Sequence, residues 1–87
     1  MISSQKEKAL VTGASSGIGL EIAKVLGSQG CDLVITARRK AELESLAKEL
    51  TERHSIDVQV VVSDLSDQVG VENLIRETGE IDILVNN

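Results

Sequence analysis

Apolar residues follow two different patterns in this chain, and segments of the two kinds alternate along the sequence. The first is a short, nearly continuous run rich in branched aliphatic residues, which predicts a buried β-strand. Four such runs lie at 8–12, 33–36, 58–62 and 81–85. The second pattern is a longer segment in which apolar residues recur every three or four positions, which predicts an amphipathic helix. Three such segments separate the four runs.

The apolar stripe of each predicted helix has a regular spacing. The stripes are Ile18, Ile22, Val25 and Leu26 in the helix that begins at Gly17, Leu43, Leu46, Ala47 and Leu50 in the second, and Val71, Leu74 and Ile75 in the third. Gly30 stands where a left-handed cap would end the first helix, and Gly79 is expected to stop the third. Ser66 or Asp67 can cap the start of the third.

Strict alternation of strand and helix predicts a parallel α/β sheet with right-handed crossovers. The doubly wound, Rossmann-type fold has the strand order 3-2-1-4-5-6, of which four strands supply 3-2-1-4 with helices on both faces. We therefore expect residues 1–87 to form the amino-terminal half of one dinucleotide-binding domain, ending after strand four, with residues 1–7 as a polar lead. The expected ligand site is the crevice between the first and fourth strands.

Composition narrows the function classes. The net charge of −5 disfavours nucleic acid as a partner. No apolar run approaches the ~20 residues of a membrane span, and no secretory segment is apparent, so we expect a cytoplasmic protein. The single cysteine, Cys31, excludes an internal disulfide, and the single histidine, His54, leaves no metal cluster. We expect Cys31 to be buried before the second strand and His54 to lie at the end of the second helix.

A glycine-rich turn, Thr12-Gly13-Ala14-Ser15-Ser16-Gly17-Ile18-Gly19, joins the first predicted strand to the first helix. Gly13 lets the chain turn off the strand, Gly17 lets backbone N–H groups approach a phosphate, and Gly19 lets the helix pack close to the sheet. The helix start offers unpaired N–H groups, and Ser15 and Ser16 add hydroxyl donors. The spacing differs from the common G-x-G-x-x-G, but the position between strand and helix favours a pyrophosphate-binding turn over a flexible glycine loop.

This turn resembles the cofactor signature of the short-chain dehydrogenase/reductase family. Asp64-Leu65 after the third strand is similar to that family's adenine-contacting pair, and Asn86-Asn87 matches the first half of its Asn-Asn-Ala-Gly motif. The resemblance covers the chain from Lys8 onward. It implies that the dinucleotide contacts Gly13, Ala14, Ser15, Ser16, Gly17, Ile18, Gly19, Asp64, Leu65 and Asn87, with Asn87 beside the adenosine ribose. Asn86 is expected to tie the fourth strand to its neighbours.

The end of the second strand indicates which dinucleotide binds. An NAD site usually carries an acidic residue ~20 positions beyond the glycines, and here Ala37 takes that place, followed by Arg38, Arg39 and Lys40. An arginine can hold a phosphate through paired charge-assisted hydrogen bonds. The alternative is a solvated basic patch, but cations at a helix start oppose the macrodipole by ~0.3–1 kcal/mol each. We predict NADP(H) in preference to NAD(H), with Arg38 and Arg39 near the 2′-phosphate.

The resemblance also implies a reaction. In that family, hydride transfer between a hydroxyl and a carbonyl uses a Tyr, a Lys four residues later, a Ser and an Asn, all beyond the fourth strand. This chain contains no tyrosine, so we expect no catalytic residue in it and no dehydrogenase activity from it alone. The parent would be a homo-oligomeric enzyme acting on a small-molecule carbonyl or alcohol. The alternatives are a non-catalytic dinucleotide-binding module and an inert truncated product.

Overall fold

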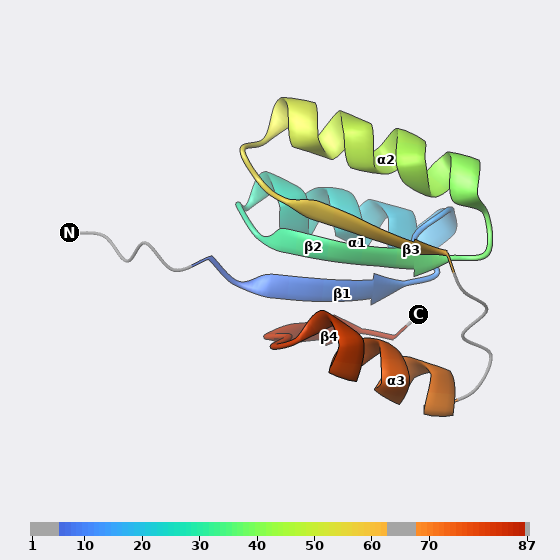
Figure 1. The fold of residues 1–87 in the computed structure, drawn as a ribbon. Coiled ribbons are helices and arrows are strands. Elements are labelled where there is room, and N and C mark those ends of the chain that lie inside the picture. Colours follow the sequence, from blue (N-terminus) through green and yellow to red (C-terminus); the bar gives the residue numbers. More distant parts are fainter. Residues whose placement is uncertain (1–5, 63–67, 87) are drawn as a thin grey trace.

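The computed structural model describes residues 6–62 and 68–86 as an α/β fold (Figure 1). Strands and helices alternate along the chain, as the sequence predicts. The strands are β1 (Lys8–Thr12), β2 (Asp32–Ala37), β3 (Val58–Val62) and β4 (Ile83–Val85), and the helices are α1 (Gly17–Ser28), α2 (Lys40–Arg53) and α3 (Gln68–Thr78). No helix in the described ranges is both long enough and apolar enough to cross a membrane.

The four strands form one parallel sheet in the order β3-β2-β1-β4. This confirms the predicted order and places β1 between β2 and β4, at the point where the chain reverses its direction of winding. β4 is shorter than its apolar run of 81–85 predicts. Asp82 stands before it, donating its backbone N–H to the Lys8 carbonyl at 2.8 Å and accepting the Lys8 N–H on its carboxylate at 2.8 Å. The two bonds tie the entry of β4 to that of β1.

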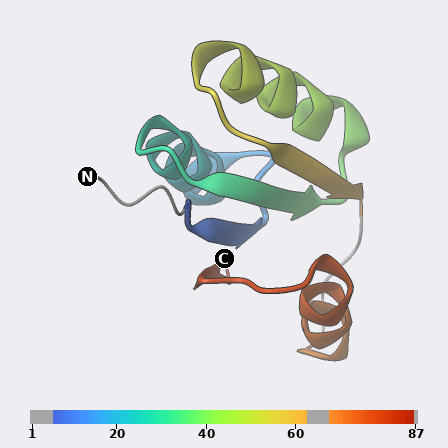
Figure 2. The ribbon, with the colours of Figure 1, turned by 60° about the vertical axis from the view of Figure 1, so that its left-hand side comes forward.

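Successive strand residues pack into two separate hydrophobic clusters, because side chains alternate between the faces of a sheet. Val11 and Ile35 belong to the larger cluster, together with Leu43 and other residues of α1 and α2. Leu10 and Val34 belong to the smaller cluster with Leu74 of α3. Figure 2 shows the result, with α1 and α2 on one side of the sheet and α3 on the other. The predicted covering of both faces is thus confirmed.

The helix stripes are confirmed in α2 and in part of α3. Leu43, Leu46 and Leu50 are buried in α2. In α3, Leu74 is buried and Ile75 packs against the same cluster, whereas the side chain of Val71 lies outside the described part. The proposed caps Ser66 and Asp67 also lie outside it.

The buried face of α1 differs from the predicted stripe. The residues that α1 buries are Gly19, Ala23 and Gly27, whereas Ile18 is 71% exposed and Val25 54% exposed. Small residues let the helix backbone approach the sheet closely: a Cβ added at Gly27 would lie 3.3 Å from the Ile56 side chain. The prediction that Ile18 and Val25 face the core is therefore wrong, because the tightest contact selects the smallest side chains rather than the largest.

The two glycines predicted to end helices, Gly30 and Gly79, lie just after α1 and α3 as expected. After α1, Gly30 has φ +89° and donates to the Gly27 carbonyl, while the Cys31 N–H donates to that of Leu26. This pair of bonds is the Schellman motif, which satisfies the last carbonyls of the helix. Gly79 has φ +85° directly after α3.

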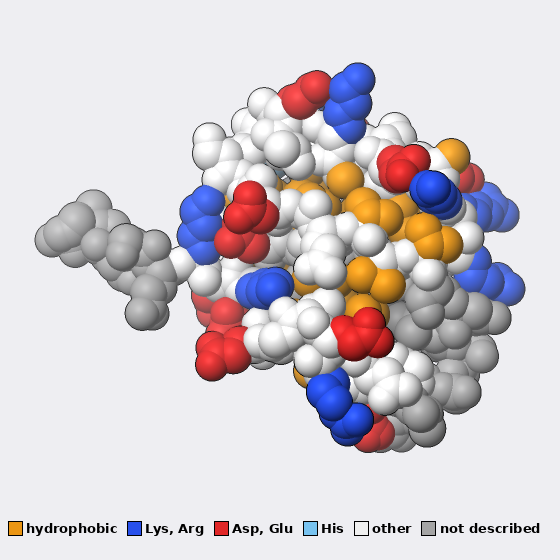
Figure 3. All heavy atoms as spheres, viewed as in Figure 1, with side chains coloured by type: hydrophobic (Ala, Val, Ile, Leu, Met, Phe, Trp, Pro, Cys, Tyr) orange, Lys and Arg blue, Asp and Glu red, His pale blue; other side chains and the backbone are white. Residues whose placement is uncertain are grey.

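Figure 3 shows that charged side chains surround a band of hydrophobic ones on the viewed face.

Candidate functional site

The turn between β1 and α1 has the backbone that its glycines predict. Gly13 and Gly17 both have φ +63°, a left-handed conformation that side chains disfavour. Between them, Ala14 is buried and donates its N–H to the Thr36 carbonyl at 3.1 Å. This hydrogen bond anchors the turn to the last part of β2. The turn is therefore fixed at the carboxyl edge of the sheet.

The start of α1 is suited to an anion. Ser16 occupies the N-cap position with extended backbone (φ −163°), its side chain makes no capping hydrogen bond, and the first turn of the helix contains no acidic residue. A Cβ added at Gly17 would meet no atom of the described residues within 4 Å, so the space that they leave in front of this residue is open. Uncapped N–H groups at the positive end of a helix dipole attract phosphate. The residues present thus fit a pyrophosphate.

The basic segment, Arg38-Arg39-Lys40, lies at the same edge of the sheet. Thr12 and Thr36 pair in register near the ends of β1 and β2, so the glycine turn and the start of α2 follow neighbouring strands (Figure 1). Arg38 is exposed and forms no ion pair within the described residues. Arg39 is the N-cap residue of α2, and its Nη1 lies 3.5 Å from Oε2 of Glu42. The two arginines therefore differ in their electrostatic surroundings.

The end of β4 closes the other side of this edge. The Thr12 hydroxyl lies 3.3 Å from both the Val85 carbonyl and Oδ1 of Asn86. Asn86 thus links β4 to β1, as predicted. Asp64, Leu65 and Asn87, the remaining predicted contacts of the dinucleotide, lie outside the described residues. The structure therefore brings together the glycine turn, Arg38 and Asn86.

Sequence reasoning missed Thr36. Its hydroxyl is fully buried and has no hydrogen-bond partner among the described residues, although such a group costs about 1–3 kcal/mol when unsatisfied. Thr36 lies in β2 on the α3 side of the sheet, because its neighbour Ile35 packs on the other side. No sequence pattern separates it from the other residues of this strand, so only the three-dimensional environment identifies it.

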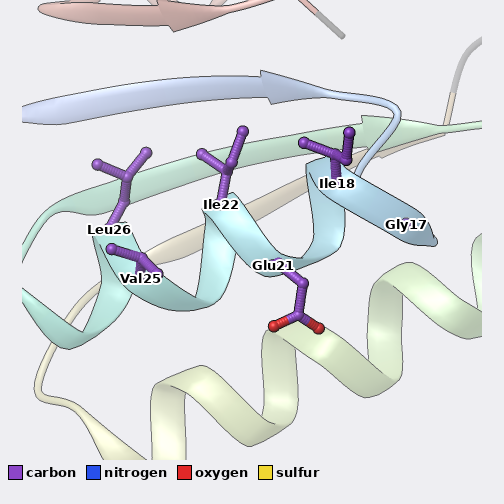
Figure 4. A pocket seen from close by; sticks show the side chains of 6 residues that line it. All are labelled: Gly17, Ile18, Glu21, Ile22, Val25 and Leu26. Carbon is purple, nitrogen blue, oxygen red and sulfur yellow. The ribbon is translucent and has the colours of Figure 1, made fainter.

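A cavity of about 550 Å³ lies along the flank of α1. Apart from Gly17 and Glu21, all of its lining residues are aliphatic: Ile18, Ile22, Val25 and Leu26. Figure 4 shows Ile18, Ile22 and Leu26 in a row on one side of the helix and Glu21 on the opposite side. The cavity has no cationic lining residue, so it does not fit a phosphate. It is distinct from the glycine turn and shares only Gly17 and Ile18 with it.

Cys31 and His54 stand apart from this edge. Cys31 is 6% exposed, and burial, with smaller contributions from the carboxylates of Glu7, Asp32 and Asp82, raises the pKa of its thiol. His54 ends α2, where its N–H donates to the Leu50 carbonyl at 2.9 Å. Both lie where the sequence predicts. Within the described ranges, no group of three or more His, Cys, Asp or Glu residues could hold a metal ion.

Comparison with known proteins gives a consistent result. The sequence pattern of the short chain dehydrogenase family matches residues 7–87. An uncharacterised oxidoreductase of Staphylococcus saprophyticus is 38% identical over 91 residues, which cover the whole chain and 39% of that protein. A short-chain dehydrogenase from Sphingobium yanoikuyae, solved with NADPH, is 38% identical with a TM-score of 0.80, over 90% of this chain and 32% of that one.

An L-sorbose reductase from Gluconobacter frateurii, solved with NADPH and L-sorbose, is similar to a comparable degree. Its identity is 37% and its TM-score 0.82, over 94% of this chain and 33% of that one. The chain therefore spans 32–39% of the length of these relatives.

Proposed function

This chain belongs to the short-chain dehydrogenase family, and from that premise we propose that it is the cofactor-binding part of an NADP(H)-dependent oxidoreductase. The parent enzyme would interconvert a hydroxyl and a carbonyl of a small molecule by hydride transfer. In this proposal, residues 1–87 form the amino-terminal half of one dinucleotide-binding domain, with 1–7 as a polar lead. The bound cofactor would supply the hydride, and this chain would bind and orient its adenosine and pyrophosphate portions.

The observation that carries the proposal is the arrangement at the carboxyl edge of β1 and β2. A helix start with no side-chain cap and no acid in its first turn faces open space. Arg38, without an ion-pair partner in the described part of the chain, follows the adjacent strand. A pyrophosphate needs the first feature, and a 2′-phosphate is favoured by the second. The two related structures solved with NADPH support the same cofactor class.

Each predicted contact has a role in this proposal. The backbone of the glycine turn, with the hydroxyls of Ser15 and Ser16, would bind the pyrophosphate, and Arg38 would pair with the 2′-phosphate, assisted by Arg39. The adenosine would contact the remaining predicted residues, Asp64, Leu65 and Asn87. The Thr12–Asn86 contact at 3.3 Å would keep the β4 side of the crevice in register with the turn.

Titration calorimetry with NADPH and NADH tests the role of Arg38. We expect the 87-residue chain to prefer NADPH and the Arg38→Gln variant to lose about tenfold to a hundredfold of its NADPH affinity with little change for NADH, because a hydrogen bond to a charged group contributes about 1.5–3 kcal/mol. Arg76→Gln is the matched control, since Arg76 is exposed on α3 and loses the same charge. Equal affinity of the wild-type chain for the two dinucleotides would contradict the proposal.

A second candidate is a non-catalytic dinucleotide-binding module. It is favoured by one observation: none of the 87 residues is a tyrosine, so the chain has no phenol to serve as general acid or base in the way the family uses it. We expect dinucleotide binding without NADPH-dependent reduction of ketones or aldehydes by the purified chain. Spectrophotometric loss of NADPH in the presence of a carbonyl substrate would refute this expectation.

A further inference from the structure

The ion pair between Arg39 and Glu42 divides the basic segment into two unequal parts. Arg39 Nη1 lies 3.5 Å from Glu42 Oε2, and both side chains are substantially exposed, at 71% and 45%. Neither Arg38 nor Lys40 has an ion-pair partner within the described residues. One of the three cations is thus partly neutralised by a carboxylate in the first turn of α2.

Resting on the proposed function, we propose that Glu42 is a specificity-determining residue that limits the preference for NADP(H) by holding Arg39 in an ion pair. In the wild-type chain, Arg38 carries the contact with the 2′-phosphate, and Arg39 contributes less than its charge would allow. Glu42 also places a negative charge in the first turn of α2, which would weaken the binding of a phosphate held by Arg38 further. Both effects lower the affinity for a 2′-phosphate and leave a 2′-hydroxyl almost unaffected.

Electrostatics gives the size of the effect. Unit charges a few ångströms apart interact by only about 1 kcal/mol in water, and exposed pairs are screened further by salt. The effect is therefore a few-fold change in affinity at low ionic strength, and it should shrink as salt is added. A purely structural role predicts something different. An acidic residue in the first turn stabilises a helix, and loss of that stability would affect NADPH and NADH equally.

The experiment compares Glu42→Gln with Glu44→Gln in the 87-residue chain. Glu44 is exposed on the same helix and forms no ion pair among the described residues, so the second variant makes the same charge change away from Arg39. NADPH and NADH are titrated calorimetrically at low and at high salt. We expect Glu42→Gln to raise NADPH affinity about twofold to fivefold at low salt and to leave NADH affinity unchanged, whereas Glu44→Gln changes neither.

A third variant tests the route through Arg39. In Arg39→Gln/Glu42→Gln the released arginine is absent, so we expect NADPH affinity to return to about the wild-type value. Equal gains for NADPH and NADH, an equal gain in Glu44→Gln, or a full gain in the double variant would overturn the role of Glu42. A wild-type chain that binds neither dinucleotide would instead refute the proposed function, and with it this inference.

Discussion

Gly17 and Gly30 have comparable backbones in different functional surroundings. Their φ angles are +63° and +89°, and an added Cβ would meet no atom within 4 Å at either position. An alanine in this conformation costs about 1–2 kcal/mol, so we expect Gly17→Ala and Gly30→Ala to lower the melting temperature by similar amounts. Only Gly17→Ala places a methyl group in the space proposed for the pyrophosphate, and it should weaken NADPH binding about tenfold.

Calorimetric titration and thermal melting of the two variants separate these effects. Gly30 lies at the end of α1, remote from the glycine turn at its start, and it therefore reports the backbone cost alone. An unchanged NADPH affinity in Gly17→Ala, after melting has shown that the variant folds, would remove Gly17 from the site.

Cys31 gives a prediction for pH dependence. Burial raises the pKa of its thiol above the unfolded value, which is ordinarily about 8.5. The folded chain therefore keeps the proton where the unfolded chain loses it. This contribution to stability is complete below the unfolded pKa and is lost as pH rises through the folded pKa.

Urea unfolding at about pH 7.5 and about pH 9.5 measures this linkage. We expect the free energy of unfolding of the wild-type chain to fall above about pH 8.5, by at most ~1.4 kcal/mol per pH unit, relative to that of Cys31→Ala. Parallel pH profiles for the two proteins would show that the thiol is not responsible.

At the residue scale, the sequence predicts what depends on one residue type in one local context. The positive φ angles of Gly13 and Gly30 follow from such contexts, as does the burial of Cys31. The unsatisfied hydroxyl of Thr36 depends instead on which partner a side chain meets in the folded chain. Local periodicity carries no information about that choice.

At the element scale, α1 shows how a helix can be predicted correctly and its buried face incorrectly. Periodicity locates the helix, because Ile18, Ile22, Val25 and Leu26 form one stripe. It assumes, however, that the apolar stripe packs on the sheet. In the structure the smallest residues, including Ala23, meet the sheet, and of the predicted stripe Leu26 packs partly against the core. Ile18 and Val25 are exposed and line a cavity on the flank of the helix (Figure 4).

Val25 tests this arrangement. It is 54% exposed, whereas Ala23 on the adjacent face is fully buried. We expect Val25→Lys to change the free energy of unfolding by no more than about 0.5 kcal/mol and to reduce binding of a dye that reports exposed apolar surface. Ala23→Lys should prevent folding, because it buries an unpaired charge. If Val25→Lys destabilised the chain as strongly as Ala23→Lys, the predicted stripe would be the core face after all.

At the scale of the whole molecule, the order of elements determines the sheet almost completely. Right-handed crossovers leave few arrangements for alternating strands and helices, and the order β3-β2-β1-β4 is the predicted one. The exact extent of β4 could not be predicted, because Ile81 extends the predicted strand across the single polar residue Asp82. Asp82 instead bonds to Lys8 before the strand begins, a contact between residues far apart in the chain.

The two outer strands should differ in their tendency to associate. In the doubly wound order, β3 is an outer strand whereas β4 is an interior one, yet β4 pairs here only with β1 among the described residues. An unpaired apolar edge invites pairing with another chain. We therefore expect the 87-residue chain to associate in a concentration-dependent manner, measured by light scattering after gel filtration.

Leu84 and Val62 provide a matched pair of substitutions, since each is 47% exposed, on β4 and β3 respectively. Leu84→Lys should reduce association more than Val62→Lys, because a lysine on the β4 edge opposes the pairing of β4 with a second chain. A monodisperse wild-type monomer with a cooperative melting transition would contradict this account of the edge.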